Sequence, residues 1–415
     1  MRFLKFNFQD RKFTFLIGVA AILTVVSVLI YPTHTLDAST LGLRIWWNMV
    51  FPALLPFFIL CDIVIAYGIA HALGVLIDPL LRRLFRLPGI AGWSLISGAL
   101  AGSPAGVEAV VQLRIAGRID QLAGERITMM SHYANPIFMI TIVAVAFLQR
   151  PDLAFFICMV HYMSALGSAI VFRNYLLPSR NSVPTEIYTT PRQSMWSKVS
   201  LAIHEARQTD QRSFGQLLGD AVSGSLQKLM MIGGTIMMFS VLLELVSVTG
   251  ISDLLVHILQ WFIQPNSMLI SHVDTFISGI TEVHMGIYSV TQMGPLSIVW
   301  KTAILCGMMG WGGLAVHLQV RALLHATDIR YTPFLLARMV QSFLSMLLVI
   351  LLWQPYHRWF ASAIPSYQNN ETPISIADTS IFWDMYLPWR NSYVVFFLLT
   401  FMLAAVIYSS RSRSS

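Results

Sequence analysis

The sequence predicts an all-α, polytopic integral membrane protein with about eight spans. Of the 415 residues, 56% are hydrophobic and only 11% are charged, whereas soluble domains have about 25% charged residues. Several apolar runs reach the length of about 20 residues that a helix needs to span a bilayer. The net charge of +7 is typical of cytoplasmic loops rich in Lys and Arg. No basic run alternates with aromatic residues, so no nucleic acid is expected as a partner.

The first two spans are predicted at residues 13–31 and 45–69. The first run follows several basic residues, is longer than the apolar core of a signal peptide and lacks a small-residue cleavage site. It is therefore expected to remain as a span. A short polar stretch at 32–40 leads to the second run, which begins with Trp46 and Trp47. Tryptophan is typical of the membrane interface, and both residues are expected to act as anchors there.

The next segments predict a surface helix, a re-entrant hairpin and two spans. Residues 76–86 are too short and too basic to cross, and are expected to form an amphipathic helix on the cytoplasmic face. The apolar run at 88–112 is interrupted at 102–106 and has arginines on both sides. A hairpin that enters and returns keeps both basic clusters inside, as the positive-inside rule requires. Residues 127–148, broken at Asn135-Pro136, then cross outward, and residues 155–176 cross back.

The second half of the chain predicts the same order of elements. A basic loop at 177–225 is expected in the cytoplasm. Few basic residues flank the apolar run at 267–290, which is interrupted at 278–282 and is expected to form a hairpin entering from outside. The other expected segments are a span at 226–248, an amphipathic piece at 251–263, a span at 295–324 broken at 310–313, a span at 334–353, an external loop at 354–390 and a last span at 393–408.

The two halves are predicted to be inverted repeats, because the first begins by crossing inward and the second by crossing outward. Their breaks are equally spaced: 31 residues separate Pro104 from Asn135, and 31 separate Glu282 from Gly313. An even number of spans places both basic termini in the cytoplasm. The predicted units are residues 1–40 (leader and first span), 41–176 (first repeat), 177–225 (cytoplasmic loop), 226–353 (second repeat) and 354–415 (external loop and last span).

Matched breaks in the apolar segments of two halves indicate a transporter site. A helix broken inside the bilayer exposes backbone N–H and C=O groups that lipid cannot satisfy, so the break must face protein or a watery cavity. The N-terminus of a broken helix also attracts anions. The alternative is that these glycines and prolines serve only close helix packing.

Polar and small residues at the breaks are the candidates for the site. Substrate binding is predicted for Gly102, Ser103, Gly106, Asn135, Ser278, Gly279, Thr281, Glu282 and Gly312. Coupling to an ion or proton is predicted for Glu108, Glu282, His284, His317 and Gln319. The alternatives are local capping for the hydroxyls, an ion pair with an arginine for Glu108, and ordinary packing for the histidines. Because no nucleotide-binding or hydrolase motif is present, no catalytic residue, metal or cofactor is expected.

Several short motifs stand out along the chain: Pro56-Phe57-Phe58, Pro88-Gly89, SGALAGSPAG at 97–106, Asn135-Pro136, GITE at 279–282 and DIRYTP at 328–333. Together they resemble the YlbJ (SpoVV) family of sporulation integral membrane proteins, over nearly the whole chain up to about Trp353. That family belongs with the nucleoside recognition, or Gate, domain proteins, which are similar to concentrative nucleoside transporters. Ser103 and His284 depart from the family pattern, which usually has Tyr and Thr there.

The resemblance implies a role in endospore formation. The family is expected to export dipicolinic acid, a small aromatic dianion, from the mother cell across the outer forespore membrane. The expected partners are therefore a small anionic substrate and the lipid bilayer, and the sequence leaves homo-oligomer formation open. Two alternatives remain: a transporter of a nucleoside or related solute, and a non-transporting membrane scaffold for spore cortex assembly.

Overall fold

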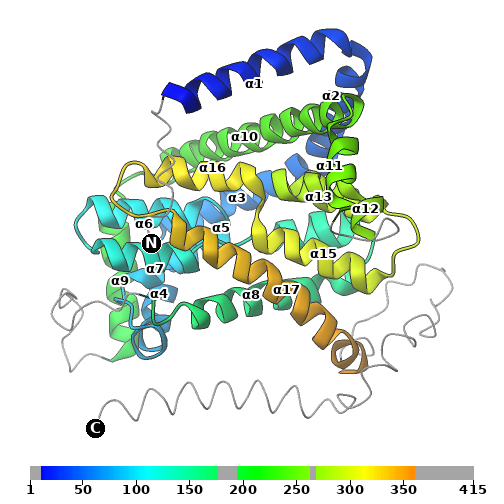
Figure 1. Ribbon diagram of the computed structural model, residues 1–415. Coiled ribbons are helices and arrows are strands. Elements are labelled where there is room, and N and C mark those ends of the chain that lie inside the picture. Colours follow the sequence, from blue (N-terminus) through cyan, green and yellow to red (C-terminus); the bar gives the residue numbers. More distant parts are fainter. Residues whose placement is uncertain (1–10, 176–193, 262–267, 360–415) are drawn as a thin grey trace.

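The computed structural model describes residues 11–175, 194–261 and 268–359, and every regular element within these ranges is a helix (Figure 1). The predicted all-α membrane class is therefore confirmed. Five helical segments are long and apolar enough to cross a bilayer: Pro32–Ala66, Pro151–Val171, Phe214–Val248, Ile298–Leu324 and Thr332–Arg358. The predicted last span and most of the external loop lie outside the described residues, and the count of eight spans stays a prediction.

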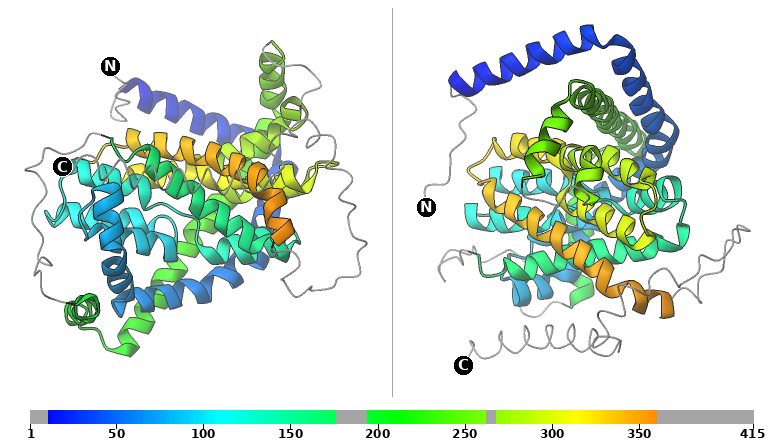
Figure 2. Two further views of the ribbon diagram at one scale, coloured as in Figure 1. Left: turned by 90° about the horizontal axis from the view of Figure 1, so that it is seen from below. Right: turned by 45° about the vertical axis from the view of Figure 1, so that its right-hand side comes forward.

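The N-terminal helices form one layer with α10 (Phe214–Val248). Helix α1 (Arg11–Ile30) lies outside the body of the bundle and beside α10 (Figure 2). Helix α2 (Pro32–Ile45), a π-helical segment η1 (Trp46–Val50) and α3 (Phe51–Ala66) then run on without interruption. The polar stretch expected before the second span is therefore helical. Proline at its first position suits a helix start.

Only one of the two tryptophans predicted as interface anchors is exposed. Trp47 is exposed, but Trp46 is buried and its indole N–H donates a hydrogen bond of 2.9 Å to the Leu229 carbonyl of α10. Gly233 leaves room for the Trp46 ring, since a side chain there would collide with it. The expectation for Trp46 is therefore wrong, because a neighbouring helix offers its indole both space and an acceptor.

Both predicted hairpins form pairs of helices joined at a break. The first is α5 (Ala91–Ala101) and α6 (Ala105–Ile115). The second is α13 (Val273–Thr281) and α14 (Val283–Gln292), preceded by the short α12 (Met268–Ser271). Helix α4 (Ile69–Leu80) and a π-helical turn η2 (Leu81–Phe85) precede the first hairpin, and α11 (Ile251–Leu259) precedes the second.

Glycines hold the two legs of each hairpin together. Gly98 and Gly106 face each other in the first hairpin, and a side chain at either would collide with the Ser131 carbonyl. Gly286 faces Gly279 in the second hairpin in the same way, and Met308 fills the space beside them. Close backbone approach of this kind requires residues without a Cβ atom.

Two of the predicted spans are broken as expected. The first consists of α7 (Gln121–Met130) and the π-helical η3 (Phe138–Phe147). The second consists of α15 (Ile298–Trp311) and α16 (Gly313–Leu324). The short η4 (Pro151–Leu153), α8 (Ala154–Val171) and the long α17 (Thr332–Trp359) follow in the chain, and α8 and α17 pack against α15.

The segment predicted as a basic loop is partly helical. Helix α9 (Met195–Thr209) packs against α4, and α10 begins at Phe214, well before the expected start of its span. Ser194 caps α9, and Ser213 with Gln216 forms a capping box at the start of α10. These caps satisfy the free N–H groups at the two helix starts and explain why the segment is ordered there.

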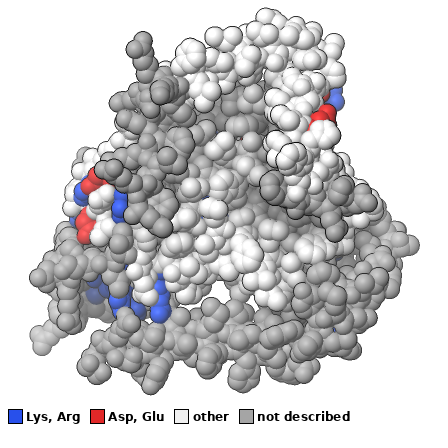
Figure 3. Space-filling view, in the orientation of Figure 1, with Lys and Arg blue, Asp and Glu red and all other residues white. Residues whose placement is uncertain are grey.

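Charged side chains gather at the ends of the bundle. On the face in Figure 3, they form clusters at the left and at the upper right, and the described surface between them is uncharged. The left end contains η2, the loops after α6 and α16, and α9; we call it the basic end, and its cations include Arg82, Arg83, Arg114, Arg118, Lys198 and Arg330. The positive-inside rule predicts that this end faces the cytoplasm.

Two ion pairs join the halves of the chain at the basic end. The exposed Arg114 guanidinium holds the Asp328 carboxylate through two hydrogen bonds of 2.7 and 2.8 Å, and this contact lowers the pKa of Asp328. Arg330 binds Glu125 at 2.5 and 2.8 Å. Here the Glu125 side chain is fully buried, whereas that of Arg330 is 51% exposed. The loop between α16 and α17 is thereby attached to α6 and α7.

The unequal burial of this second pair predicts unequal mutational effects. Arg330→Ala should lower the free energy of unfolding by about 3 kcal/mol, because it leaves a buried carboxylate without its counter-charge. Glu125→Gln should cost less than about 1 kcal/mol, since the half-exposed guanidinium can turn to water. Titration of the purified protein with a denaturing detergent measures both changes. Asp328→Asn, which removes the exposed pair, is the control and should also cost less than about 1 kcal/mol. Equal losses for Arg330→Ala and Glu125→Gln would contradict this account.

Candidate functional site

The tip of the first hairpin packs against the break in the first broken span. The Ser103 backbone N–H donates a hydrogen bond of 3.0 Å to the Tyr133 carbonyl. Gly102 has a φ of +81° and lies against Asn135, so a side chain at this position would be both strained and crowded. The Asn135 side-chain oxygen accepts the Phe138 N–H at 2.7 Å and so caps the start of η3.

The tip of the second hairpin packs against the second broken span in a similar way. Gly312 and Gly313 have φ angles of +89° and +77°, and Gly313 lies against the backbone of residues 281–283. The Trp311 indole N–H donates to the Ile280 carbonyl at 2.9 Å. The predicted breaks are therefore confirmed. Glycine can adopt a positive φ, and so it can end one helix and begin the next.

These two arrangements lie beside each other. The Phe138 ring of η3 meets the His284 ring of the second hairpin edge to face, with ring centroids 4.9 Å apart. The His132 ring at the first break lies against Gly312 at the second break. We call the region formed by residues 102–104, 131–138, 281–284 and 311–313 the hairpin site. It unites residues more than 170 positions apart in the sequence.

Glu282 is a buried acid at the centre of the hairpin site. It is 2% exposed and serves as the N-cap of α14. One carboxylate oxygen accepts the Met285 N–H at 2.8 Å, and the other lies 2.6 Å from His284 Nδ1. The positive end of the helix dipole favours a negative charge here. Glu282 therefore caps a helix, a role that the sequence did not predict, and is also an ionisable group next to a titratable partner.

Helix α17 carries a polar stripe toward the broken spans: Arg338, Gln341, Ser342 and Ser345. The fully buried Arg338 guanidinium donates to the Met129 and His132 carbonyls at 2.7 and 2.9 Å, at the C-terminal end of α7. Ser342 and Ser345 donate to carbonyls of α15 at 2.8 and 2.9 Å. Arg338 thus supplies partners to backbone carbonyls next to the first break, which lipid could not do. The two serines join α17 to α15.

Several buried polar atoms around the hairpin site have no hydrogen-bond partner within the described residues. Both amide atoms of the fully buried Gln341 are among them. Buried polar groups are nearly always paired, so each such atom calls for a water molecule or a ligand. The others at or next to the site are Ser103 Oγ, Ser131 Oγ, His132 Nδ1, His161 Nδ1, Ser278 Oγ and Arg338 Nε.

The remaining predicted site residues have different surroundings. The Thr281 hydroxyl donates to carbonyls of its own helix, as the capping alternative expects. Gly106 and Gly279 lie at the contacts between hairpin legs. His317 contacts the Tyr331 hydroxyl at 2.7 Å and the Trp311 carbonyl at 3.0 Å, which fixes its ring below the second break.

The last two coupling candidates lie on α6 and α16, the helices that begin at the first hairpin tip and at the second broken span. Glu108 is part-buried in the first turn of α6, and no ion pair links it to an arginine among the described residues. Gln319 is part-buried on α16. Within the described ranges, no three His, Cys, Asp or Glu side chains are grouped as metal ligands.

The sequence analysis did not predict the polar stripe on α17 or the ion pair between α10 and α3. Lys228 of α10 binds Asp62 of α3 at 2.9 and 3.0 Å, and Asp62 lines a cleft of about 1030 Å³ at the basic end. Ionisable residues inside apolar runs are functional candidates by default. That rule could have identified Asp62, Lys228 and Arg338 from the sequence. The stripe also has helical spacing, at residues 338, 341, 342 and 345.

Comparisons with known proteins agree with this architecture. Residues 47–172 match the Gate family model, described as nucleoside recognition. The chain is 35% identical over 351 residues to the sporulation integral membrane protein YlbJ of Bacillus subtilis (strain 168), covering 83% of this chain and 84% of that protein. No solved structure matches the chain significantly.

The contact between Gly286 and Gly279 predicts a strong effect of one added methyl group. Gly286→Ala should separate the legs of the second hairpin and lower the free energy of unfolding by about 3 kcal/mol, because overpacking of backbone against backbone cannot be relieved by a rotamer change. Gly294→Ala is the control, since the space around Gly294 is open. Detergent denaturation of both variants measures the difference. A Gly286→Ala protein as stable as Gly294→Ala would disprove the close contact.

Proposed function

Because the chain belongs to the YlbJ family of sporulation integral membrane proteins, we propose that it is a secondary transporter of a small anionic metabolite. Dipicolinic acid is the leading substrate, exported from the mother cell across the outer forespore membrane as the family resemblance implies. The protein would not be an enzyme. The observation that carries the proposal is the meeting of two hairpin tips with two broken helices, surrounded by buried polar atoms that have no partner among the described residues.

The donors at the hairpin site suit an anion. Helices α6 and α16 begin there, and free N–H groups at helix starts bind carboxylates. The Gln341 and Asn135 amides can each offer N–H donors. Arg338 adds a positive charge without a carboxylate partner among the described residues. A planar dicarboxylate could accept hydrogen bonds at both ends from such a set.

The Glu282–His284 contact is the proposed coupling element. A substrate that carries negative charge must be accompanied by a cation or proton, or exchanged for another anion, if transport is to be driven by a gradient. Glu282 and His284 share a hydrogen bond of 2.6 Å next to the substrate groups, so uptake of a proton by this pair would change the local charge at the site.

The proposed topology contains eight spans and two re-entrant hairpins in two inverted repeats, residues 41–176 and 226–353. Both termini and the basic end are proposed to face the mother-cell cytoplasm. The concentration of Lys and Arg at the basic end supports this orientation. In alternating access, the two repeats would rock around the hairpin site while its residues remain at mid-membrane.

A nucleoside or related solute is the second candidate substrate. It is favoured by the match of residues 47–172 to a family described as nucleoside recognition. Amides and hydroxyls such as those of Gln341 and Ser278 could hydrogen-bond a base or a ribose. A non-transporting scaffold for cortex assembly would need none of these unpartnered atoms, so it lacks a comparable observation in its favour.

Reconstituted transport tests the proposal directly. Purified protein in liposomes should accumulate labelled dipicolinate, and Glu282→Gln and Asn135→Ala should reduce uptake at least about tenfold by removing a charge and an amide from the site. Glu244→Gln is the matched control, because Glu244 pairs with His34 on the far side of α10 and should leave uptake unchanged. No uptake under any imposed ion or proton gradient would reject dipicolinate, and competition by nucleosides would favour the second candidate.

Gln341→Leu separates transport from stability. Leucine has a similar volume and needs no partner, so this variant should be as stable as the parent protein or more stable by about 1 kcal/mol. Transport should nevertheless fall at least about tenfold, because the site loses both amide groups. Detergent denaturation and liposome uptake, measured on the same preparation, give the two values. Loss of stability together with transport would show that Gln341 is structural.

A further inference from the structure

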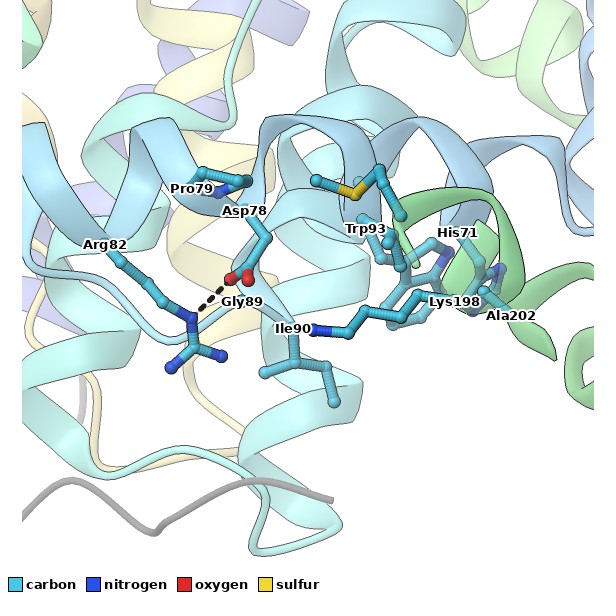
Figure 4. Close-up of a pocket in the computed structure, with 12 residues that line it drawn as sticks. His71, Asp78, Pro79, Arg82, Gly89, Ile90, Trp93, Lys198 and Ala202 are labelled. Carbon is cyan, nitrogen blue, oxygen red and sulfur yellow. Dashed lines mark hydrogen bonds and ion pairs between the residues drawn. The ribbon is translucent and has the colours of Figure 1, made fainter. Parts of the chain in front are cut away.

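A large cleft opens at the basic end of the bundle, outside the hairpin site. Its volume is about 1030 Å³, and it lies between α3, α9, the start of α10 and the base of the first hairpin. The stacked rings of Trp93 and His71, with centroids 5.1 Å apart, form part of its wall and also border a smaller pocket (Figure 4). The proposed transport mechanism uses none of the residues that line this cleft.

Asp62 lies at the inner end of the cleft. The other lining residues of α3 are Ile65 and Ala66, in its last turn, and α10 lines the cleft as far as Ala221. One turn farther along α10, a side chain at Gly224 would lie 3.9 Å from the Asp62 carboxylate. Asp62 therefore lies where the cleft ends and the packed contact between α3 and α10 begins.

An ion pair and an aromatic ring close the cleft at this end. Lys228 Nζ of α10 donates to the two carboxylate oxygens of Asp62 at 2.9 and 3.0 Å. The same ammonium group lies 6.0 Å from the centroid of the Phe58 ring, which is one turn before Asp62 on α3 and is buried. We call Asp62, Lys228 and Phe58 the inner barrier.

The inner barrier lies between the cleft and the tip of the first hairpin. Cys61, next to Asp62, is buried, and its thiol donates to the Leu100 carbonyl of α5 at 3.8 Å. Leu100 is two residues before Gly102, which lies at the tip. The cleft, by contrast, borders α5 near the start of that helix, at Trp93. A path from the cleft past the inner barrier therefore leads toward the hairpin site.

The ion pair of the inner barrier can open at little cost. The Lys228 and Asp62 side chains are 32% and 25% exposed. Ion pairs that remain in contact with water contribute little net stability, whereas a fully buried charge is costly to separate from its partner. The pair also joins α3 of the first predicted repeat to α10 of the second. Motion of one repeat past the other would therefore break this contact.

We propose that the cleft is the route of the transported anion between the basic end and the hairpin site, and that the inner barrier is the gate that closes it. This inference rests on the proposed function, because it assigns a path to the same solute. With the ion pair formed, as in this structure, α3 and α10 are held together and the path is closed. With the pair open, the two helices separate at this level and the hairpin site becomes accessible from the basic end.

Reaction of Cys61 with a membrane-impermeant thiol reagent tests the gate without any solute. Cys158→Ala and Cys306→Ala leave Cys61 as the only cysteine of the chain. Because Cys61 is 6% exposed, it should react slowly when the ion pair is intact. Asp62→Asn and Lys228→Met should each raise the rate about fivefold, the shift in an opening equilibrium that follows the loss of a partly exposed ion pair. Intact cells and inside-out vesicles present the two sides of the membrane to the reagent.

Three control variants accompany this measurement. Gly224→Cys, made in a chain without other cysteines, lies on the cleft side of the ion pair with open space around it. It should react rapidly and so identify the side of the membrane on which the cleft opens. Asp220→Asn removes an exposed ion pair elsewhere in the cleft wall and should leave the Cys61 rate unchanged. Combining Asp62→Lys with Lys228→Asp restores an ion pair and should restore the slow rate.

Three results would overturn the gate. Equal rates for Cys61 and for Gly224→Cys would show that the inner end is already open. No change with either Asp62→Asn or Lys228→Met would show that the ion pair does not close the path. A rise with only one of them would show an effect of charge on the reagent, since the two substitutions change the local charge in opposite directions.

A transport measurement tests the route separately. In liposomes, a bulky maleimide attached at Gly224→Cys should block most uptake of labelled dipicolinate, because it fills the cleft next to the gate. Unchanged uptake after complete modification would reject the cleft as the route. Absence of uptake by the unmodified protein would reject dipicolinate transport instead, and the Cys61 rates would still decide whether the inner barrier is a gate.

Discussion

Backbone hydrogen bonding at the helix breaks is the constraint on which the structure depends. At each of the four breaks one helix ends and another begins inside the bundle, and their free N–H and C=O groups need partners that lipid cannot provide. The structure supplies them from side chains: Asn135 and Glu282 cap helix starts, and Arg338 binds carbonyls at the end of α7. The polar residues of the hairpin site therefore stabilise the breaks, and in the proposed transporter they would also contact the solute.

The proposed binding of a solute accounts for the polar groups there that have no partner among the described residues. A site that satisfied every donor and acceptor internally would have nothing left for a solute to bind. Within the described part of the chain, the amide of Gln341 and the hydroxyls of Ser103 and Ser278 are buried without partners. The paired groups fix the backbone, and in the proposed transporter the groups without a partner among the described residues would contact the solute. Selectivity for a dianion or a nucleoside would depend mainly on the second set.

The sequence predicted the helix breaks, which local residue types determine. It did not predict features that depend on contacts between segments distant in the chain. The breaks at Gly102, Asn135 and Gly312 were placed correctly, because glycine and proline interrupt a helix wherever they occur in this pattern. The burial of Trp46 depends on Gly233, nearly 190 residues away, and could not be read from the run around it. The stripe on α17 was overlooked because the span is otherwise apolar, although its spacing was visible. Helix α9 depends on its cap and on packing against α4.

The glycine contacts between hairpin legs have a consequence for motion. Legs that touch through backbone atoms cannot be parted by turning a side chain, so opening a hairpin near its tip would require its two helices to move apart and lose this close packing. In the proposed transporter, a hairpin that moves as one piece past its neighbours would keep its glycine contact, its cap and its break intact.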